Sequence, residues 1–329
     1  MNTLDEQHMH LAVTSAGDAR LRSRPNPWVG AVVVSPSGEV FTGSTLEPGN
    51  AHAEVVALNA AGKNAVGATL YSTLEPCGHT GRTGPCTAAI IESGISRVVV
   101  GTLDPDTNVS GSGVQQLRNA GITVEVGVLE HEVRTQLAPY LHHRSTGRPF
   151  VVLKMASTID GRIAAADGSS QWITGETARK RVHQLRAESD AIVVGAGTVR
   201  ADNPSLTVRD VQGPSPRRIV LGEIDSQANI HPCTQWTGSL TDLLDTLGNE
   251  GVVQLLVEGG ARVAASFHRE RLINQYVMHI APVIAGGDNA AGVFAGPAAA
   301  TMADMWRGHV VSATNLGGDI EIILEPNLN

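Results

Sequence analysis

Short apolar runs alternate along the first part of the chain with amphipathic stretches. Residues 3–20 carry apolar positions at mixed helical spacing, which predicts a first helix. The apolar runs 31–34 and 40–43 flank Ser-Pro-Ser-Gly, a turn composition that predicts a β-hairpin. Further strands are predicted at 68–72, 98–101 and 123–127, and further helices at 55–61, 87–93 and 113–119. Such alternation predicts a layered α/β domain.

A second set of elements follows residue 149. Strands are predicted at 150–156, 192–194, 218–221, 255–258, 276–281 and 320–324, and helices at 242–247 and 261–267. The polar stretch 142–149 contains a Gly and a Pro and is typical of a linker. Because single cores stop growing near about 250–300 residues and this chain has 329, we expect two α/β domains, 1–146 and 147–329. His142 and His143 are interpreted as surface side chains, since no third metal ligand stands nearby in the sequence.

Charge and composition restrict the classes of function. The formal net charge of −8 argues against a nucleic-acid-binding face, which would need clustered Lys and Arg. No apolar run approaches the roughly 18 residues of a membrane helix, and the N-terminus lacks a secretion signal. Three cysteines are too few for a disulfide framework, and Cys233 is given no function. We therefore expect a cytoplasmic protein without nucleic-acid or membrane partners.

The candidate chemistry lies between residues 51 and 87. His52 is followed two residues later by Glu54, and Cys77 and Cys86 each follow a proline. This pattern matches the zinc-deaminase signature, in which a His and two thiolates hold Zn²⁺ and a Glu that is not a ligand moves protons. His52, Cys77 and Cys86 are therefore the predicted zinc ligands, and Glu54 is the predicted acid and base.

The chemistry explains the choice of residue types. Three protein ligands leave the fourth position of tetrahedral zinc to water, and the metal lowers the pKa of that water toward about 7. The resulting hydroxide can attack a ring carbon that carries an amino group, while Glu54 takes the proton and delivers it to the departing nitrogen. His52, Glu54 and Cys86 are also predicted at helix starts, where the helix dipole favours anionic groups.

Other interpretations of these residues stay open. In a closed structural zinc site His79 would be the fourth ligand, and in a reduced cytosol Cys77 and Cys86 could be free thiols. Neither interpretation gives Glu54 a chemical task. The eight residues between the two cysteines also depart from the common separation of two.

Three stretches together resemble the deaminase half of the bifunctional riboflavin-biosynthesis deaminase/reductase family. They are Pro-Asn-Pro-Trp-Val-Gly at 25–30, His-Ala-Glu at 52–54, and the wide cysteine segment with Gly-Arg-Thr at 81–83. The resemblance implies a cytidine-deaminase-like α/β/α fold. It also implies that Asn26 contacts the pyrimidine, although a simple turn residue between two prolines is an equally good interpretation. Arg82 and His79 could reach a substrate phosphate or be solvated loop side chains.

The second half resembles the reductase half of the same family, in blocks that keep the expected order. These blocks are 150–164, 170–174, 185–187, 190–199 and 202–209. The resemblance implies a dihydrofolate-reductase-like α/β fold. It implies that NADPH is bound by Ala156, Trp172, Thr198, Asp202, Glu258, Gly259 and Gly260. It also implies that the substrate is bound by Lys154, Ser170, Arg186, Leu206, Arg209 and Glu258, with Lys154 and Glu258 facing the sugar and the others holding the phosphate.

The residues themselves support these roles less sharply. Glycines after the strands 192–194 and 255–258 would let a dinucleotide phosphate approach the backbone, but neither forms the full six-residue glycine pattern. Two arginines suit a dianionic phosphate because each offers a planar fork of donors. The alternatives are a helix-surface charge for Arg186 and a core aromatic for Trp172.

The two halves together imply a reaction sequence on a pyrimidine ribotide. The 2,5-diamino-6-ribosylamino-4(3H)-pyrimidinone 5′-phosphate would be deaminated, and its ribosyl group would then be reduced to ribityl with NADPH. Compared with the family, the segment 222–251 is short by about one strand–helix unit, which puts the reductase activity in question. The alternatives are another zinc nucleobase or nucleoside deaminase with an impaired or unrelated second domain, and a non-enzymatic zinc module. The apolar C-terminal strands predict a homo-oligomer.

Overall fold

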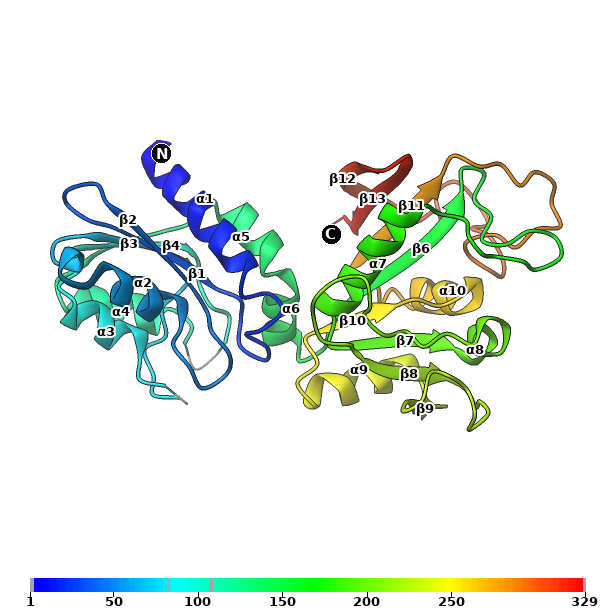
Figure 1. Cartoon of the computed structure of the whole chain (residues 1–329), viewed down its shortest axis with the longest axis horizontal. Helices are drawn as coiled ribbons and strands as arrows, with labels where there is room; N and C mark the ends of the chain where they lie inside the picture. The colour runs from blue at the N-terminus through cyan, green and yellow to red at the C-terminus, as the bar shows by residue number, and fades with distance from the viewer. Residues whose placement is uncertain (1–2, 82, 107–108, 328–329) are drawn as a thin grey trace. The chain divides into compact units, whose positions relative to one another are not determined.

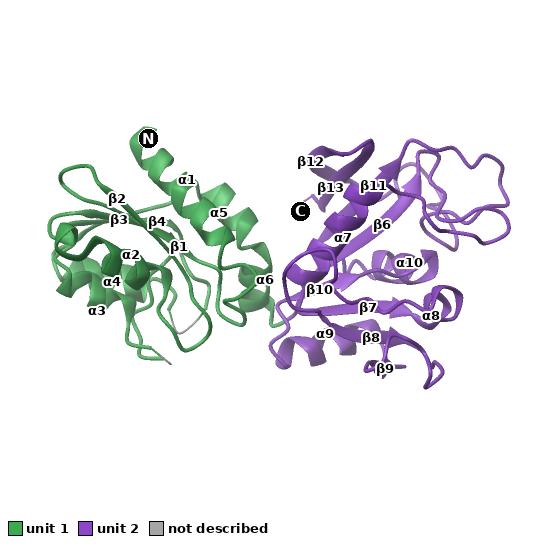
Figure 2. Cartoon of the chain, viewed as in Figure 1, with its two compact units in different colours: residues 1–147 green, residues 148–329 purple. Residues whose placement is uncertain are grey.

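The chain forms two compact units, each with its own β-sheet. The computed structural model describes residues 3–81, 83–106 and 109–327. Unit 1 comprises residues 1–147 and unit 2 comprises residues 148–329 (Figure 2). None of the helices in the described ranges combines the length and apolar character needed to cross a bilayer.

Unit 1 is built on a five-stranded sheet in the order β2-β1-β3-β4-β5. Its strands are β1 (Gly30–Val34), β2 (Val40–Ser44), β3 (Thr69–Leu74), β4 (Arg97–Thr102) and β5 (Thr123–Val126). Its helices are α1 (Thr3–Gly17), α2 (Ala53–Ala61), α3 (Cys86–Glu92), α4 (Ser112–Asn119), α5 (Glu130–Gln136) and α6 (Ala138–Thr146), with a 3₁₀ turn at Gly62–Ala65. β1 pairs antiparallel with β2 and β3, whereas β3, β4 and β5 run parallel.

Two glycines let helices pack directly on opposite faces of this sheet. A Cβ on Gly30 would lie 1.9 Å from the carbonyl oxygen of Ala12 in α1, and a Cβ on Gly43 would lie 2.4 Å from that of Ala53 in α2. Gly43 pairs with Ala31, the neighbour of Gly30, so the two glycines face opposite sides. The sheet therefore lies between helical layers (Figure 1), which confirms the predicted α/β/α fold.

The end of unit 1 differs from the sequence prediction. Helix α6 continues to Thr146, so most of the predicted linker 142–149 is helical. His143 is buried, at 8% exposure, and the prediction of a surface side chain is wrong for it. One side of α6 packs inward through Tyr140 and Leu141, and this burial is not evident from the polar sequence at the end of the helix.

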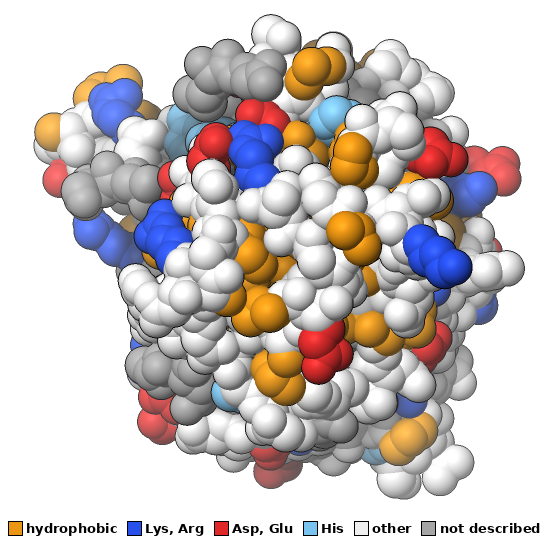
Figure 3. All heavy atoms as spheres, turned by 90° about the vertical axis from the view of Figure 1, so that its left-hand side faces the viewer, with side chains coloured by type: hydrophobic (Ala, Val, Ile, Leu, Met, Phe, Trp, Pro, Cys, Tyr) orange, Lys and Arg blue, Asp and Glu red, His pale blue; other side chains and the backbone are white. Residues whose placement is uncertain are grey.

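Charged side chains lie among hydrophobic and polar ones on the face shown in Figure 3.

Unit 2 is built on an eight-stranded sheet in the order β12-β13-β11-β6-β10-β7-β8-β9. Its strands are β6 (Phe150–Thr158), β7 (Ala191–Gly195), β8 (Arg217–Leu221), β9 (Thr234–Trp236), β10 (Gln254–Val257), β11 (Gln275–Ala281), β12 (Gly308–Leu316) and β13 (Asp319–Pro326). Its helices are α7 (Glu176–Glu188), α8 (Ala196–Asp202), α9 (Leu240–Asn249) and α10 (Ala261–Arg269). The strands from β11 to β9 in this order run parallel, and β13 pairs antiparallel with both β11 and β12.

The structure corrects the prediction of a missing strand–helix unit after residue 221. Strand β9 pairs in parallel with β8 at the sheet edge, and α9 follows it before β10. The prediction failed because β9 spans only three residues and has no long apolar run.

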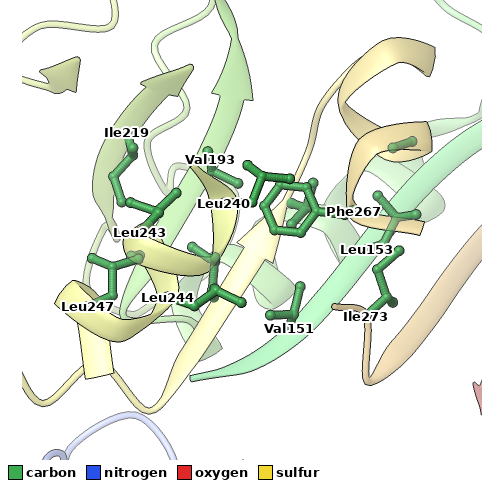
Figure 4. Close-up of a cluster of buried hydrophobic side chains, with 14 of the residues drawn as sticks. Val151, Leu153, Val193, Ile219, Leu240, Leu243, Leu244, Leu247, Phe267 and Ile273 are labelled. Atoms are coloured by element: carbon green, nitrogen blue, oxygen red, sulfur yellow. The ribbon is translucent and has the colours of Figure 1, made fainter. Parts of the chain in front are cut away.

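One face of this sheet is covered by α9 and α10. Leu243 and Leu247 of α9 and Phe267 of α10 are buried in one hydrophobic cluster with Val151 and Leu153 of β6 and Ile219 of β8 (Figure 4). Because side chains alternate across a strand, the even-numbered Lys154 and Ala156 point to the other face of β6. Helix α7 packs against β10, so the carboxyl ends of the parallel strands are the part of the sheet that remains available for a site.

Candidate active sites

Three potential metal ligands meet in unit 1 where two helices begin. His52 immediately precedes α2, Cys86 is the first residue of α3, and Cys77 lies between β3 and α3. Nδ1 of His52 is 3.6 Å from Sγ of Cys77 and 3.3 Å from Sγ of Cys86. All three ligand atoms lie within 4.8 Å of one another. The predicted ligands are thus brought together around one point.

The chemistry of this donor set fits a zinc ion. Hydrogen bonds from the side chains of Cys86 and, to a lesser extent, His52 hold the pKa of Cys77 well below its usual range. The hydrogen bond between the two cysteines, together with burial, raises the pKa of Cys86. The two sulfurs therefore compete for one proton, and a cation between them would replace it. Among the described residues, His79 does not belong to this ligand group. Three N/S ligands with an open position suit catalytic zinc.

Glu54 lies beside these ligands in the first turn of α2 and is 3% exposed. Burial, with a further contribution from the charge of Cys77, raises the pKa of Glu54 to about 7. A cavity of about 240 Å³ opens next to it and is also lined by Asn26 and His79. Arg82 lies outside the described residues. Glu54 therefore has both access to a bound molecule and a proton affinity suited to neutral pH.

A buried carboxylate that sequence reasoning missed ties the surrounding loops together. Glu75, which immediately follows β3, is 4% exposed. It accepts hydrogen bonds from the backbone N–H groups of Asp104 (3.3 Å), Gly111 (2.9 Å), Gly113 (3.0 Å) and Val114 (3.1 Å). These bonds fix the start of α4 and the loop after β4 beside the segment that carries Cys77. The only signal in the sequence was an acidic residue ending an apolar strand.

Asp104 is a second lining residue that the sequence analysis did not identify. It lies in the loop after β4 and lines the cavity of unit 1. Its carboxylate accepts a hydrogen bond of 3.0 Å from the hydroxyl of Tyr140 in α6. Burial raises the pKa of Asp104. The α6 helix therefore supports the cavity wall.

Unit 2 contains a larger cavity, of about 1590 Å³. Every residue predicted for the reductase site lines it, namely Lys154, Ala156, Ser170, Trp172, Arg186, Thr198, Asp202, Leu206, Arg209, Glu258, Gly259 and Gly260. The cavity lies at the carboxyl ends of the parallel strands β6, β7 and β10, the usual position of ligand sites in such sheets. Helices α8 and α10 begin there.

Arg186 and Glu258 form a bidentate ion pair in this cavity. Nε and Nη2 of Arg186 donate to the two carboxylate oxygens of Glu258 at 2.7 and 2.8 Å. Only 12% and 10% of the two side chains is exposed, so the surface-charge alternative for Arg186 is wrong. Burial alone would raise the pKa of Glu258, but the charge and hydrogen bonds of Arg186, with the charge of Lys154, lower it overall. Burial lowers the pKa of Lys154.

Trp172 does not belong to the core of unit 2. Its side chain is 71% exposed, and the guanidinium of Arg179 lies 4.8 Å from the centre of its ring. The core-aromatic alternative is therefore wrong, and the ring is accessible on the cavity wall.

These two sites define a zinc-dependent deaminase joined to a reductase. Residues 2–102 match the model of the cytidine and deoxycytidylate deaminase zinc-binding region, and residues 149–320 match that of the RibD C-terminal domain. The riboflavin biosynthesis protein RibD of Aquifex aeolicus is 42% identical, over 86% of this chain and 88% of its own. That of Bacillus amyloliquefaciens is 36% identical, over 98% of this chain and 96% of its own.

Solved structures agree. Acinetobacter baumannii RibD superposes with a TM-score of 0.91 at 36% identity, over 98% of this chain and 99% of its own. A second structure, from Thermotoga maritima, superposes with a TM-score of 0.88 at 35% sequence identity, over 98% of this chain and 99% of its own. It is described as a diaminohydroxyphosphoribosylaminopyrimidine deaminase/5-amino-6-(5-phosphoribosylamino)uracil reductase. The chain belongs to the RibD family of bifunctional riboflavin-biosynthesis enzymes, whose cofactors are zinc and NADPH. The predicted family and both predicted folds are confirmed.

Proposed function

We propose that unit 1 deaminates 2,5-diamino-6-ribosylamino-4(3H)-pyrimidinone 5′-phosphate and that unit 2 reduces the ribosyl group of the product to ribityl. The domain limits that we propose for these two activities are 1–146 and 147–329. The main support is the pairing of a His52–Cys77–Cys86 cluster beside buried Glu54 with a separate cavity that contains Lys154 and two arginines. The Thermotoga maritima relative carries the names of both activities.

In unit 1, Glu54 performs the proton transfers. His52, Cys77 and Cys86 would hold the zinc ion, which when bound would lower the pKa of a water molecule. Glu54 accepts a proton from this water and returns it to the leaving amino group, a task suited by its raised pKa of about 7. Asn26, on the cavity wall, holds the pyrimidine ring. The release of ammonia then completes the hydrolysis.

In unit 2, side chains align the opened sugar with the nicotinamide, because NADPH supplies the hydride. Ala156, Trp172, Thr198, Asp202 and the Glu258–Gly260 turn would hold the cofactor. Ser170, Leu206 and Arg209 hold the phosphate end of the substrate, and Arg186, whose Nε and Nη2 are bound to Glu258, adds its positive charge there. Lys154 and Glu258 face the carbon that is reduced, where the Glu258 carboxylate favours the cationic imine that accepts the hydride and the Lys154 ammonium can donate a hydrogen bond to the opened sugar. All of these residues line one cavity, which supports the assignment.

Two variants, one in each unit, test whether unit 1 carries the deaminase activity and unit 2 the reductase activity. Cys86→Ala removes a zinc ligand, so zinc and ammonia release should be lost together, while reduction of the deaminated intermediate continues. Lys154→Ala should spare ammonia release and slow NADPH oxidation by about 10²-fold, the loss typical of one electrostatic contact to the transition state. Ammonia and NADPH absorbance are followed together. Full deaminase activity in Cys86→Ala would disprove the zinc site, and unaltered NADPH oxidation in Lys154→Ala would disprove its role.

The protein should form a homo-oligomer through unit 2. Strand β12 ends the sheet and exposes Val310 (60%) and Val311 (40%), and an apolar edge strand favours pairing with another chain. Sedimentation equilibrium should give a mass above that of one chain. Val310→Lys, which puts a charge on this edge, should shift the equilibrium toward the monomer. A stable wild-type monomer would refute the proposal.

We also propose that the enzyme acts in the cytoplasm. The three cysteines are free in the structure, and a zinc site with two thiolates is best maintained in a reducing compartment.

A further inference from the structure

Residues 203–210, here called the strap, follow α8, and all of them except Thr207 and Val208 line the cavity of unit 2. Ser205 and Arg209 can donate hydrogen bonds to an anion there. Nη1 of Arg209 lies 2.5 Å from Oγ of Ser205 and 3.4 Å from Oγ1 of Thr207. Between them, Leu206 is 4% exposed and has φ +53°. A leucine in this left-handed conformation is costly and persists only when neighbouring contacts hold it. The strap therefore depends on contacts from outside itself.

The imidazole of His183 in α7 supplies such contacts. Its Nδ1 accepts a hydrogen bond of 3.3 Å from the backbone N–H of Arg209, and its Nε2 lies 3.2 Å from Oδ2 of Asp210. The accepting Nδ1 places the proton of the neutral ring on Nε2, which donates to Asp210. The side chain is only 7% exposed. Both ring nitrogens are thus used to fasten consecutive residues of the strap to α7.

A second residue of α7 supports the same strap. Arg186, three residues after His183 and on the same helix face, donates to the carbonyl oxygen of Thr207 at 3.4 Å. However, the Nε and Nη2 groups of Arg186 are engaged by Glu258. The contact with Thr207 is therefore long and secondary, and His183 is the main attachment of the Arg209 backbone.

We propose that His183 is a positioning residue of the reductase site, which holds the backbone at Arg209 so that its guanidinium faces the phosphate of the substrate. The inference rests on the proposed binding of that phosphate by Arg209. Without the imidazole, Arg209 keeps its charge but loses its fixed direction, and a bidentate contact with phosphate depends on direction. The effect should fall on substrate binding and leave the hydride step nearly unchanged.

Three variants of the full-length enzyme test this proposal. His183→Leu fills the space but cannot form either hydrogen bond, whereas His183→Gln retains an acceptor and a donor. Gln184→Leu is the matched control, since Gln184 is the exposed neighbour in the same helix. The measurement is steady-state NADPH oxidation with the deaminated ribosylaminouracil phosphate as substrate, which bypasses unit 1. A nucleoside that lacks the phosphate serves as the second probe.

His183→Leu should raise KM for the phosphorylated substrate about tenfold, which corresponds to the net free energy of about one hydrogen bond. Its kcat and its KM for NADPH should change less than about twofold, and the nucleoside should be reduced as by the wild type. Gln184→Leu should behave as the wild type, and His183→Gln should recover most of the loss. This pattern is not expected from a general loss of folding.

The variant Arg209→Ala distinguishes a failure of the proposed role of His183 from a failure of the proposed phosphate binding by Arg209. If it raises KM for the phosphorylated substrate and His183→Leu does not, the role of His183 is refuted while phosphate binding by Arg209 stands. If Arg209→Ala leaves KM unchanged, the proposed phosphate contact is wrong, and the inference falls with it. An equal loss with the phosphorylated substrate and the nucleoside, in both His183 variants, would also overturn the inference.

Discussion

Replacing Glu54 with Gln should lower the rate of ammonia release by roughly 10²–10⁴-fold, the usual contribution of a positioned acid and base, while zinc stays bound. The amide has nearly the size of the carboxylate but cannot accept and return a proton at neutral pH. The three zinc ligands are untouched by the change, since Glu54 lies outside the ligand group. Ammonia release and metal content should be measured on the same preparation.

The control for this substitution is Glu92→Gln, which makes the same change at an exposed position of α3, the helix that begins with Cys86. It should keep full activity and zinc. Reduction of the deaminated intermediate should also be normal in both variants. If Glu54→Gln lost zinc together with activity, Glu54 would have a structural role, and if it kept both, the proposed proton transfer would be wrong.

Replacing Arg186 with Leu should destabilise unit 2 by about 3 kcal/mol, because it leaves the buried carboxylate of Glu258 without its main partner. The loss should lie at the lower end of the range for broken buried pairs, since the charge of Lys154 still acts on Glu258. Urea unfolding should be followed by hydrogen exchange in β7 and β10, so that unit 1 does not contribute. Arg217→Leu is the control. It breaks the Arg217–Glu250 pair, whose side chains are 43% exposed, and should cost less than about 1 kcal/mol.

The pH dependence of this loss identifies its cause. In the wild type the pKa of Glu258 is lowered, so the pair stabilises the fold fully above the ordinary glutamate pKa of about 4.3 and is lost only as pH falls through the lowered value. In Arg186→Leu, burial should raise the pKa of Glu258, and the penalty should lessen as pH falls toward this raised value. The difference in unfolding free energy between the two proteins should therefore shrink from pH 7 to pH 5. An equal difference at both pH values would mean that lost packing is responsible.

The local part of the deaminase site could be read from the sequence. His52 and Glu54 stand in one helical turn, and Cys77 and Cys86 follow prolines at the end of a strand and the start of a helix. Short segments of this kind fix where their side chains lie. The backbone hydrogen bonds that Glu75 accepts could not be predicted in this way, because their donors are 29 to 39 residues away in sequence. A lone acidic residue usually indicates a surface position.

In unit 2 the family resemblance predicted the residues that line the cavity but not the contacts between them. Arg186 and Glu258 were expected to bind different parts of the substrate, yet they bind each other across 72 residues of sequence. Their proximity depends on how α7 packs on the sheet beside β10, which no local pattern encodes. Likewise, β9 is too short for its residues to show a strand pattern, and it is held by its pairing with β8.

The contact between Gly43 and α2 determines how this enzyme can vary in evolution. Helix α2 carries Glu54 and follows His52, and it rests on bare backbone at Gly43, with no side chain between the two elements. Elsewhere in a core, a change in side-chain volume at one position can be compensated by a substitution at a neighbouring position. Here no side chain can be made smaller to admit even a methyl group, so the distance between strand and helix is not adjustable by mutation. The surfaces of unit 1 can diverge while this contact must keep its glycine, and the geometry of the metal ligands is inherited with it.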